Sequence, residues 1–154
     1  LVTVRECVAD IGTDHAYIPI YLTEHKKVKK AFAMDVNEGP LIRAEEHVRE
    51  AGLKEQIKMR RSNGLEKLSP GEVEAVIIAG MGGGLVMRIL TEGQAVQRHY
   101  KSAFCSPSRK SQRCGNFFCR TAIRSCRKRW YWMKEVLSDD ACGSFKGKRK
   151  REVG

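Results

Sequence analysis

Short apolar segments alternate with amphipathic helical segments through the first 100 residues, and this alternation constrains the fold more than any other feature. Strands are predicted over residues 7–11, 28–36, 57–61 and 73–79, and helices over 16–26, 40–51 and 85–90, with a short helical turn at 65–68. The last strand is mostly apolar and rich in β-branched residues, which is typical of a buried central strand of a parallel sheet. Strict alternation of strands and helices predicts an α/β fold with a doubly wound parallel sheet.

The net charge of +11 is confined to the C-terminal third of the chain. Residues 1–100 carry 14 Lys/Arg and 14 Asp/Glu, whereas residues 101–154 carry 15 Lys/Arg and 4 Asp/Glu. Five of the six cysteines and both tryptophans also lie beyond residue 100. We therefore expect a core over 1–100 and a basic, cysteine-rich tail over 101–154. No signal peptide and no apolar run of about 20 residues is apparent, so we expect a soluble cytoplasmic protein without membrane association.

The first predicted strand ends in a turn that suits a ligand. Asp10, Ile11, Gly12 and Thr13 follow one another there, just before a predicted helix. In open α/β sheets, ligands bind at the carboxyl ends of strands. Gly12 would let the backbone approach a ligand closely, and the N-terminus of the following helix favours polar or anionic groups. Many α/β proteins have such a turn without a cofactor, so the turn alone leaves both interpretations open.

Three further strand ends carry similar signals, each with an ordinary alternative. Asp35 can accept the hydroxyls of a ribose or cap the next helix. Asn63 and Gly64 can meet an adenine edge or form a simple turn. The glycine-rich segment 80–84 exposes bare backbone beside a ligand or only leads into a helix. Together the four strand ends predict one site of nucleoside size.

The absence of two nucleotide-binding motifs limits the classes of ligand that the site is expected to bind. The first strand is not followed by G-x-G-x-x-G, and the chain contains no G-x-x-x-x-G-K-[ST]. A dinucleotide or a triphosphate is therefore disfavoured relative to adenosine with a non-phosphate appendage, which indicates S-adenosylmethionine. The cysteines include no C-x-x-C pair, so we expect no metal site.

Four segments resemble a known family. The segments Ala9–Tyr17, Met34–Leu41, Ser62–Leu65 and Ile78–Gly83 are similar to the bacterial tRNA (adenine-N1)-methyltransferases that act on adenine 22 of tRNA. The resemblance covers about residues 7–95. It implies a class I, Rossmann-like methyltransferase domain with S-adenosylmethionine as the cofactor and tRNA as the substrate.

The resemblance also implies roles for particular residues. Asp10, Ile11, Gly12 and Thr13 would line the methionine end of the cofactor, and Asp35 with Val36 the ribose and adenine. The remaining cofactor-binding positions would be Asn63, Gly64, Ala79, Gly80 and Met81. Asn63 stands where the family usually has Asp, so we expect a weakened contact with the adenine N6 group.

Methyl transfer to adenine N1 needs little acid–base help, because N1 carries a free lone pair at neutral pH. In-line placement and stabilisation of the cationic product are what assist the reaction. The base must also be unpaired or flipped out, because N1 lies on its Watson–Crick edge. Asp14 and His15 are the candidate catalytic residues, by hydrogen bonding to N6 and by balancing charge. Alternatively, Asp14 caps the helix and His15 packs beneath it. We expect His25, His47 and His99 to be surface residues.

The basic, cysteine-rich sequence of the tail can be explained by a shift of the reading frame. A possible coding sequence for residues 105–117, shifted by one base, reads LQPQSEIAAVREF, an amphipathic sequence like the next segment of the family. In shifted frames, residues 127–135 and 136–142 likewise give the family-like sequences SEEMVLDEG and YYPMMRA. We therefore hypothesise a shifted reading frame over 101–154, which would leave the sheet incomplete at its C-terminal side. The chain also begins without the helix that the family has before its first strand, so we expect an N-terminally truncated core with weak activity or none. The alternatives are a methyltransferase for another acceptor and a non-enzymatic, basic RNA-binding protein.

Overall fold

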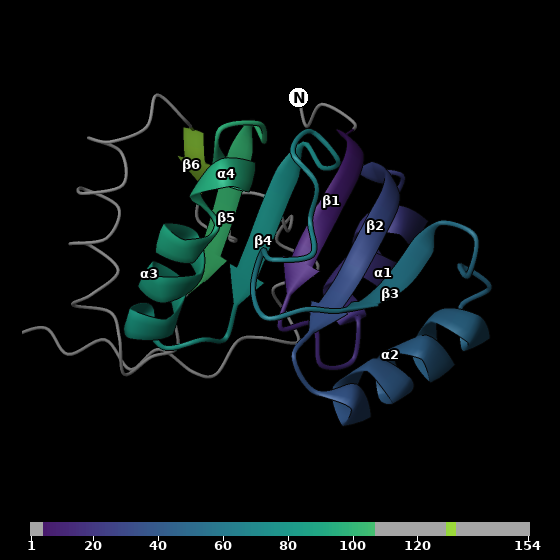
Figure 1. Ribbon diagram of the computed structural model, residues 1–154. Coiled ribbons are helices and arrows are strands. Elements are labelled where there is room, and N and C mark those ends of the chain that lie inside the picture. Colours follow the sequence, from purple (N-terminus) through teal and green to yellow (C-terminus); the bar gives the residue numbers. More distant parts are fainter. Residues whose placement is uncertain (1–4, 107–128, 132–154) are drawn as a thin grey trace, which may run out of the picture.

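The computed structural model describes residues 5–106 and 129–131, which form one six-stranded sheet with helices on both faces (Figure 1). The strands are β1 (Arg5–Ile11), β2 (Val28–Asp35), β3 (Ile57–Arg61), β4 (Ala75–Ala79), β5 (Ser102–Ser106) and β6 (Arg129–Tyr131). The helices are α1 (Tyr17–Glu24), α2 (Glu38–Glu50), α3 (Gly83–Glu92) and α4 (Gln94–Gln97).

The strand order is β3-β2-β1-β4-β5-β6, and every neighbouring pair is parallel. The chain runs outward from β1 through β2 to β3 and then returns to the other side of β1 to begin β4. The order therefore reverses between β1 and β4, and this reversal is where open α/β sheets bind ligands. Ile11, the last residue of β1, pairs with Met34 on one side and Ile78 on the other. The predicted doubly wound sheet is confirmed.

Alternate residues of the central strands fill two separate cores. Val76 and Ile78 of β4 pack in a cluster with Val86 and Ile89 of α3. Ala75 and Ile77 of the same strand pack in the cluster on the other face, which includes Leu22 of α1 with Ala44 and Val48 of α2. A strand with both faces buried needs the continuous apolar run that identified β4 in the sequence.

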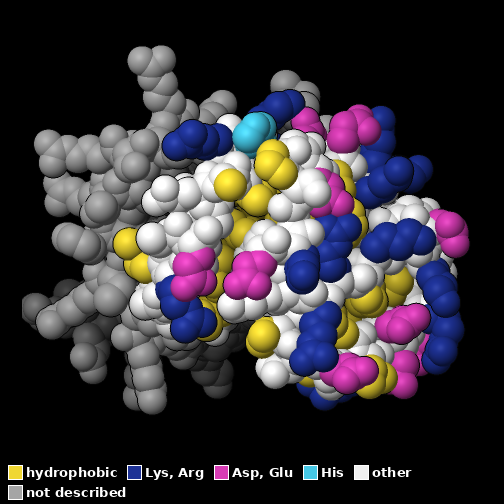
Figure 2. All heavy atoms as spheres, viewed as in Figure 1, with side chains coloured by type: hydrophobic (Ala, Val, Ile, Leu, Met, Phe, Trp, Pro, Cys, Tyr) yellow, Lys and Arg dark blue, Asp and Glu magenta, His cyan; other side chains and the backbone are white. Residues whose placement is uncertain are grey.

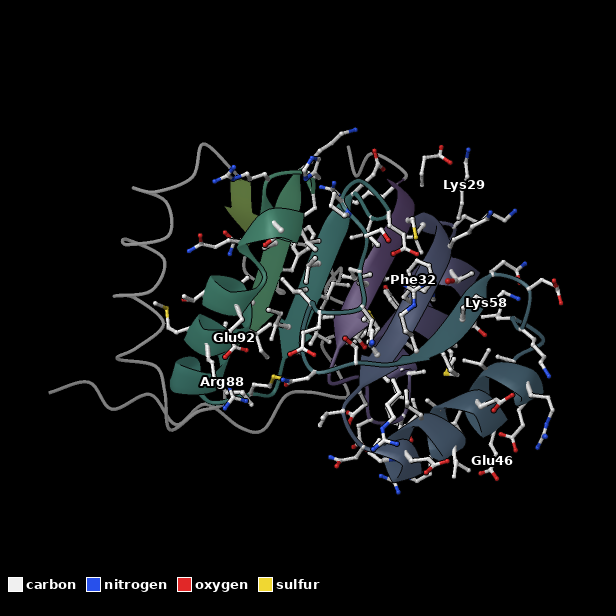
Figure 3. All side chains as sticks on the ribbon, viewed as in Figure 1. Lys29, Phe32, Glu46, Lys58, Arg88 and Glu92 are labelled. Carbon is white, nitrogen blue, oxygen red and sulfur yellow. The ribbon has the colours of Figure 1, made fainter. Side chains whose placement is uncertain are left out.

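The helices show the amphipathic spacing expected of them. Leu41, Ala44 and Val48 of α2 are buried on one face, and Pro19 lies in the first turn of α1, where proline is tolerated. The outer face of α3 carries Arg88 and Glu92, which stand one turn apart (Figure 3). Arg88 Nε lies 3.9 Å from Glu92 Oε1. On the face seen in Figure 2, basic and acidic side chains are interspersed, in agreement with the balanced charge of residues 1–100.

Several predicted boundaries differ from the structure. The strand expected from residue 73 begins at Ala75, and residues 65–68 form a turn closed by the Leu68 N–H on the Leu65 carbonyl (3.0 Å). The strands β5 and β6 both lie beyond residue 100, so the sheet continues into the predicted tail. The rest of that tail lies outside the described residues, and so does most of the sequence that suggests a frame shift, so that hypothesis stays a prediction. Within the described residues, no helix has the length and apolar character to cross a membrane.

Truncation of Ile77 tests the packing of the central strand. Ile77 is 2 % exposed, so Ile77→Ala removes buried methyl groups and is expected to lower the free energy of unfolding by roughly 2–5 kcal/mol. Ile42→Ala is the matched control, because Ile42 is 53 % exposed on α2 and its loss should cost less than about 0.5 kcal/mol. Urea unfolding of the two variants measures both values, and equal losses would contradict this packing.

Candidate functional site

The loop after β1 is attached to the end of β2. The backbone N–H groups of Gly12 and Thr13 both donate to the Met34 carbonyl, at 2.8 and 3.0 Å. Gly12 has φ 75°, in the left-handed region that glycine adopts without strain. The pairing of β1 with β2 thus extends past the last strand residue and places the first two candidate segments side by side.

The loop after β4 meets the same turn. A Cβ atom added at Gly12 would overlap the terminal methyl of Met81, so the Met81 side chain lies directly over this glycine. Gly80, with φ 72°, turns the chain at the end of β4. Ala79 is half-buried and Gly80 exposed, which leaves backbone accessible beside the turn.

Asp10 is a buried carboxyl group at this edge of the sheet. It is 3 % exposed, and burial raises its pKa from 3.8 to about 7. The Thr13 hydroxyl lowers the pKa of Asp10, whereas the negative charge of Asp35 raises it further. Ile11 is an apolar residue whose side chain packs in the core, so only its backbone can face a ligand.

Asp35 is half-buried at the end of β2, and its Oδ1 accepts a hydrogen bond from the Asn37 N–H at 2.8 Å. The N-cap residue of α2 is Asn37, so Asp35 does not occupy the capping position that was its alternative role. Val36 follows with 51 % of its surface exposed and offers an apolar face beside the carboxylate.

The third strand end joins the site through the backbone. The Ser62 N–H donates to the Asp35 carbonyl at 2.9 Å, which places Asn63 next to β2. Asn63 is exposed, and its Nδ2 donates to Glu66 Oε1 at 2.9 Å. Gly64, with φ 59°, packs against Ile89 of α3, where a Cβ atom would lie 3.0 Å from the nearest side-chain carbon. All four predicted strand ends therefore converge.

Asp14 and His15 both contact α2. Arg43 Nη2 lies 3.0 Å from Asp14 Oδ1, and His15 Nε2 lies 3.5 Å from Asp14 Oδ2. The N-cap residue of α1 is Ala16, and in this described segment no side chain caps the helix. The structure therefore does not support the alternative in which Asp14 serves as a helix cap.

The sequence reasoning missed two members of this arrangement, Arg43 and His47. His47 Nδ1 lies 3.1 Å from the His15 carbonyl, and His47 is half-buried, so the prediction that it is a plain surface residue is wrong. The rings of His15, Tyr17 and His47 lie 5.1–5.4 Å apart in nearly parallel planes. The available signal was that Arg43 and His47 stand four residues apart and so share one helix face.

His25 and His99 are exposed, and each lies near a carbonyl of its own helical neighbourhood, Tyr21 and Ala95 respectively. Over the described residues, no three His, Cys, Asp or Glu side chains are grouped so as to hold a metal ion.

The pKa of Asp10 predicts a pH-dependent stability. The folded chain holds this proton more tightly than the unfolded chain, so stability falls as pH rises from about 4 to about 7, by roughly 4 kcal/mol in total. Asp10→Asn is neutral at every pH and lacks this loss. Urea unfolding from about pH 4 to about pH 8 should show the variant gaining stability relative to the original chain. A difference between them that does not change with pH would contradict the buried, protonated carboxyl.

Known proteins share this arrangement of strands. The chain is 42% identical over 87 residues to the tRNA (adenine(22)-N(1))-methyltransferase of Bacillus subtilis, and this region covers 56% of the chain and 37% of that relative. The structure of M. capricolum TrmK with S-adenosyl-homocysteine matches with a TM-score of 0.53 and 43% identity, over 56% of this chain and 39% of that one.

A third relative was solved with S-adenosyl-L-methionine. It is Streptococcus pneumoniae Sp1610, which matches with a TM-score of 0.62 and 41% identity, over 66% of this chain and 48% of that one. The chain thus spans less than half the length of each of these relatives.

A family model described as a methyltransferase domain matches residues 1–127, which include the five strands β1–β5 and all four strand ends of the site. The parallel sheet, the reversal of strand order at β1 and β4, and the acidic residues near the carboxyl ends of β1 and β2 agree with that match. The chain therefore belongs to the family of methyltransferase domains.

Proposed function

We propose that this chain is the cofactor-binding part of an S-adenosylmethionine-dependent tRNA (adenine-N1)-methyltransferase that acts on tRNA in the cytoplasm. The observation that supports this most strongly is the convergence of four strand ends on the β1–β4 reversal. The three relatives named above are 41–43% identical to this chain over 56–66% of its length.

The residues present fit this cofactor. Thr13 Oγ1 is buried and has no partner in standard hydrogen-bond geometry among the described residues, so a ligand atom can complete its bonding. Asp10 and Thr13 would hold the methionine end, with Ile11 and Gly12 contributing backbone. Asp35 would accept the ribose hydroxyls, and its Oδ1 already accepts one N–H. When bound, the cofactor supplies an electrophilic methyl group.

The adenine of the cofactor would lie among the other strand ends. The exposed side chain of Val36 offers it an apolar surface, and the loop at Asn63 and Gly64 lies next to Asp35. Because the Asn63 amide donates to Glu66, its carbonyl oxygen is the atom suited to accept from the adenine N6 group. Ala79, Gly80 and Met81 would close the site from the β4 side.

On the acceptor side, Asp14 is the residue best placed to touch a base. Its side chain is 59 % exposed while Arg43 holds one of its oxygens. A carboxylate in this position can accept from the adenine N6 group and balance the positive charge that N1 gains on methylation. His15 is less exposed, with 33 % of its side chain accessible, and lies behind this carboxylate.

Calorimetric titration with S-adenosylmethionine tests the cofactor site. We expect Asp35→Ala to weaken binding at least tenfold, because hydrogen bonds to a charged group contribute roughly 1.5–3 kcal/mol. Glu46→Ala is the matched control, since Glu46 is exposed and points away from the sheet on α2 (Figure 3). No heat of binding from the unsubstituted chain, or equal affinities for the two variants, would argue against the site.

Transfer of a labelled methyl group tests the acceptor. We expect label in tRNA and none in a transcript whose adenine 22 is replaced by guanine, because only adenine presents an unprotonated N1 at neutral pH. Asp14→Asn should lower the transfer rate by roughly 100–1,000-fold, the scale of a lost transition-state contact. Label in free metabolites instead of RNA would support another acceptor. Salt-sensitive RNA binding without any transfer would support the non-enzymatic alternative.

A further inference from the structure

The loop that carries Asp14 and His15 has a strained backbone. Asp14 has φ 47° and Ala16 has φ 58°, and both are L-residues with a side chain in the left-handed region. Such conformations cost free energy and persist only where the surroundings over-determine them. Contacts from outside the loop are therefore needed to keep these two positions in place.

Helix α2 provides two such contacts. Arg43 and His47 stand one turn apart on the same helix face, and each reaches a different residue of the loop. Arg43 Nη2 donates to Asp14 Oδ1 at 3.0 Å. His47 Nδ1 donates to the His15 carbonyl at 3.1 Å, and because a carbonyl only accepts, this nitrogen carries the proton.

The two contacts also set the direction of the side chains. Asp14 lies between Arg43 and His15, with Oδ1 toward the guanidinium and Oδ2 toward the imidazole. The ring of His15 packs beside the ring of His47 at 5.4 Å. Rotation of the Asp14 carboxylate or of the His15 ring would therefore break a contact with α2.

The contact between Arg43 and Asp14 is poorly suited to a purely stabilising role. The side chains of Arg43 and Asp14 are 49 % and 59 % exposed, and exposed ion pairs add little to stability. What the pair does provide is orientation, because one carboxylate oxygen is fixed while the group remains open to solvent on its other side.

We propose that Arg43 and His47 are positioning residues for methyl transfer, which hold Asp14 and His15 in the orientation that receives the acceptor base. This inference rests on the proposed function. It extends the site from the strand ends to one face of α2, and it separates the cofactor contacts from the acceptor contacts.

Kinetics on the full chain tests this role. Arg43→Gln is expected to lower kcat for tRNA methylation by about 10–100-fold, the cost of a small misplacement, with the dissociation constant for S-adenosylmethionine changed less than twofold. Arg43→Lys keeps the charge and should recover part of the loss. His47→Phe keeps a ring without the donor and should lower kcat, whereas His47→Asn keeps a donor and should lower it less. Arg49→Gln removes an exposed charge from the same helix and is the matched control.

A second measurement needs no turnover. Long-range ¹H–¹⁵N spectra of the histidine rings should show the Nδ1–H form of His47, and Arg43→Gln should shift the His15 ring signals while Arg49→Gln leaves them in place. Unchanged kcat or unchanged His15 signals in Arg43→Gln, in a chain that binds S-adenosylmethionine and methylates tRNA, would overturn the positioning role alone. A chain that neither binds the cofactor nor transfers methyl groups would overturn the proposed function and this role with it.

Discussion

The parallel pairing of β1 with both β2 and β4 is the constraint on which the site depends. Ile11 ends β1 between Met34 and Ile78, so the chain segments that follow these three strands must emerge at one place. The hydrogen bonds from Gly12 and Thr13 to Met34 extend this pairing by two residues, and Met81 covers Gly12 from the β4 side. A change of register between β1 and β2 would separate Asp10 from Asp35, and one between β1 and β4 would move Met81 away from Gly12.

Much of this could be predicted from the sequence because the relevant signals are local. The buried face of α2 follows from the spacing of Leu41, Ala44 and Val48, and β4 from a run of β-branched residues. The convergence of the four strand ends was also predictable, since parallel strands of one sheet end at the same edge. The turn at Gly12 could be identified because glycine tolerates the positive φ that it has there.

The parts that were not predicted depend on how elements pack in three dimensions. Nothing local relates Arg43 or His47 to Asp14, because the loop and α2 meet only after β2 has paired with β1. The burial of Asp10, and with it a pKa of about 7, likewise follows from packing that no single segment encodes. The strand β5 was assigned to the tail because the change in charge at residue 100 does not coincide with a structural boundary.

The electrostatics of the strand ends bear on which ligand the site accepts. The negative charge of Asp35 is close enough to raise the pKa of Asp10, so two acidic groups face the same region. A phosphate-bearing ligand would meet this negative charge without a G-x-G-x-x-G loop to surround it with backbone N–H groups. A ligand with an ammonium and a sulfonium group would instead be attracted, and its positive charge would favour the ionised form of Asp10. The proposed function therefore predicts that binding of such a ligand releases a proton at neutral pH, with the buried carboxyl favouring S-adenosylmethionine over nucleotides.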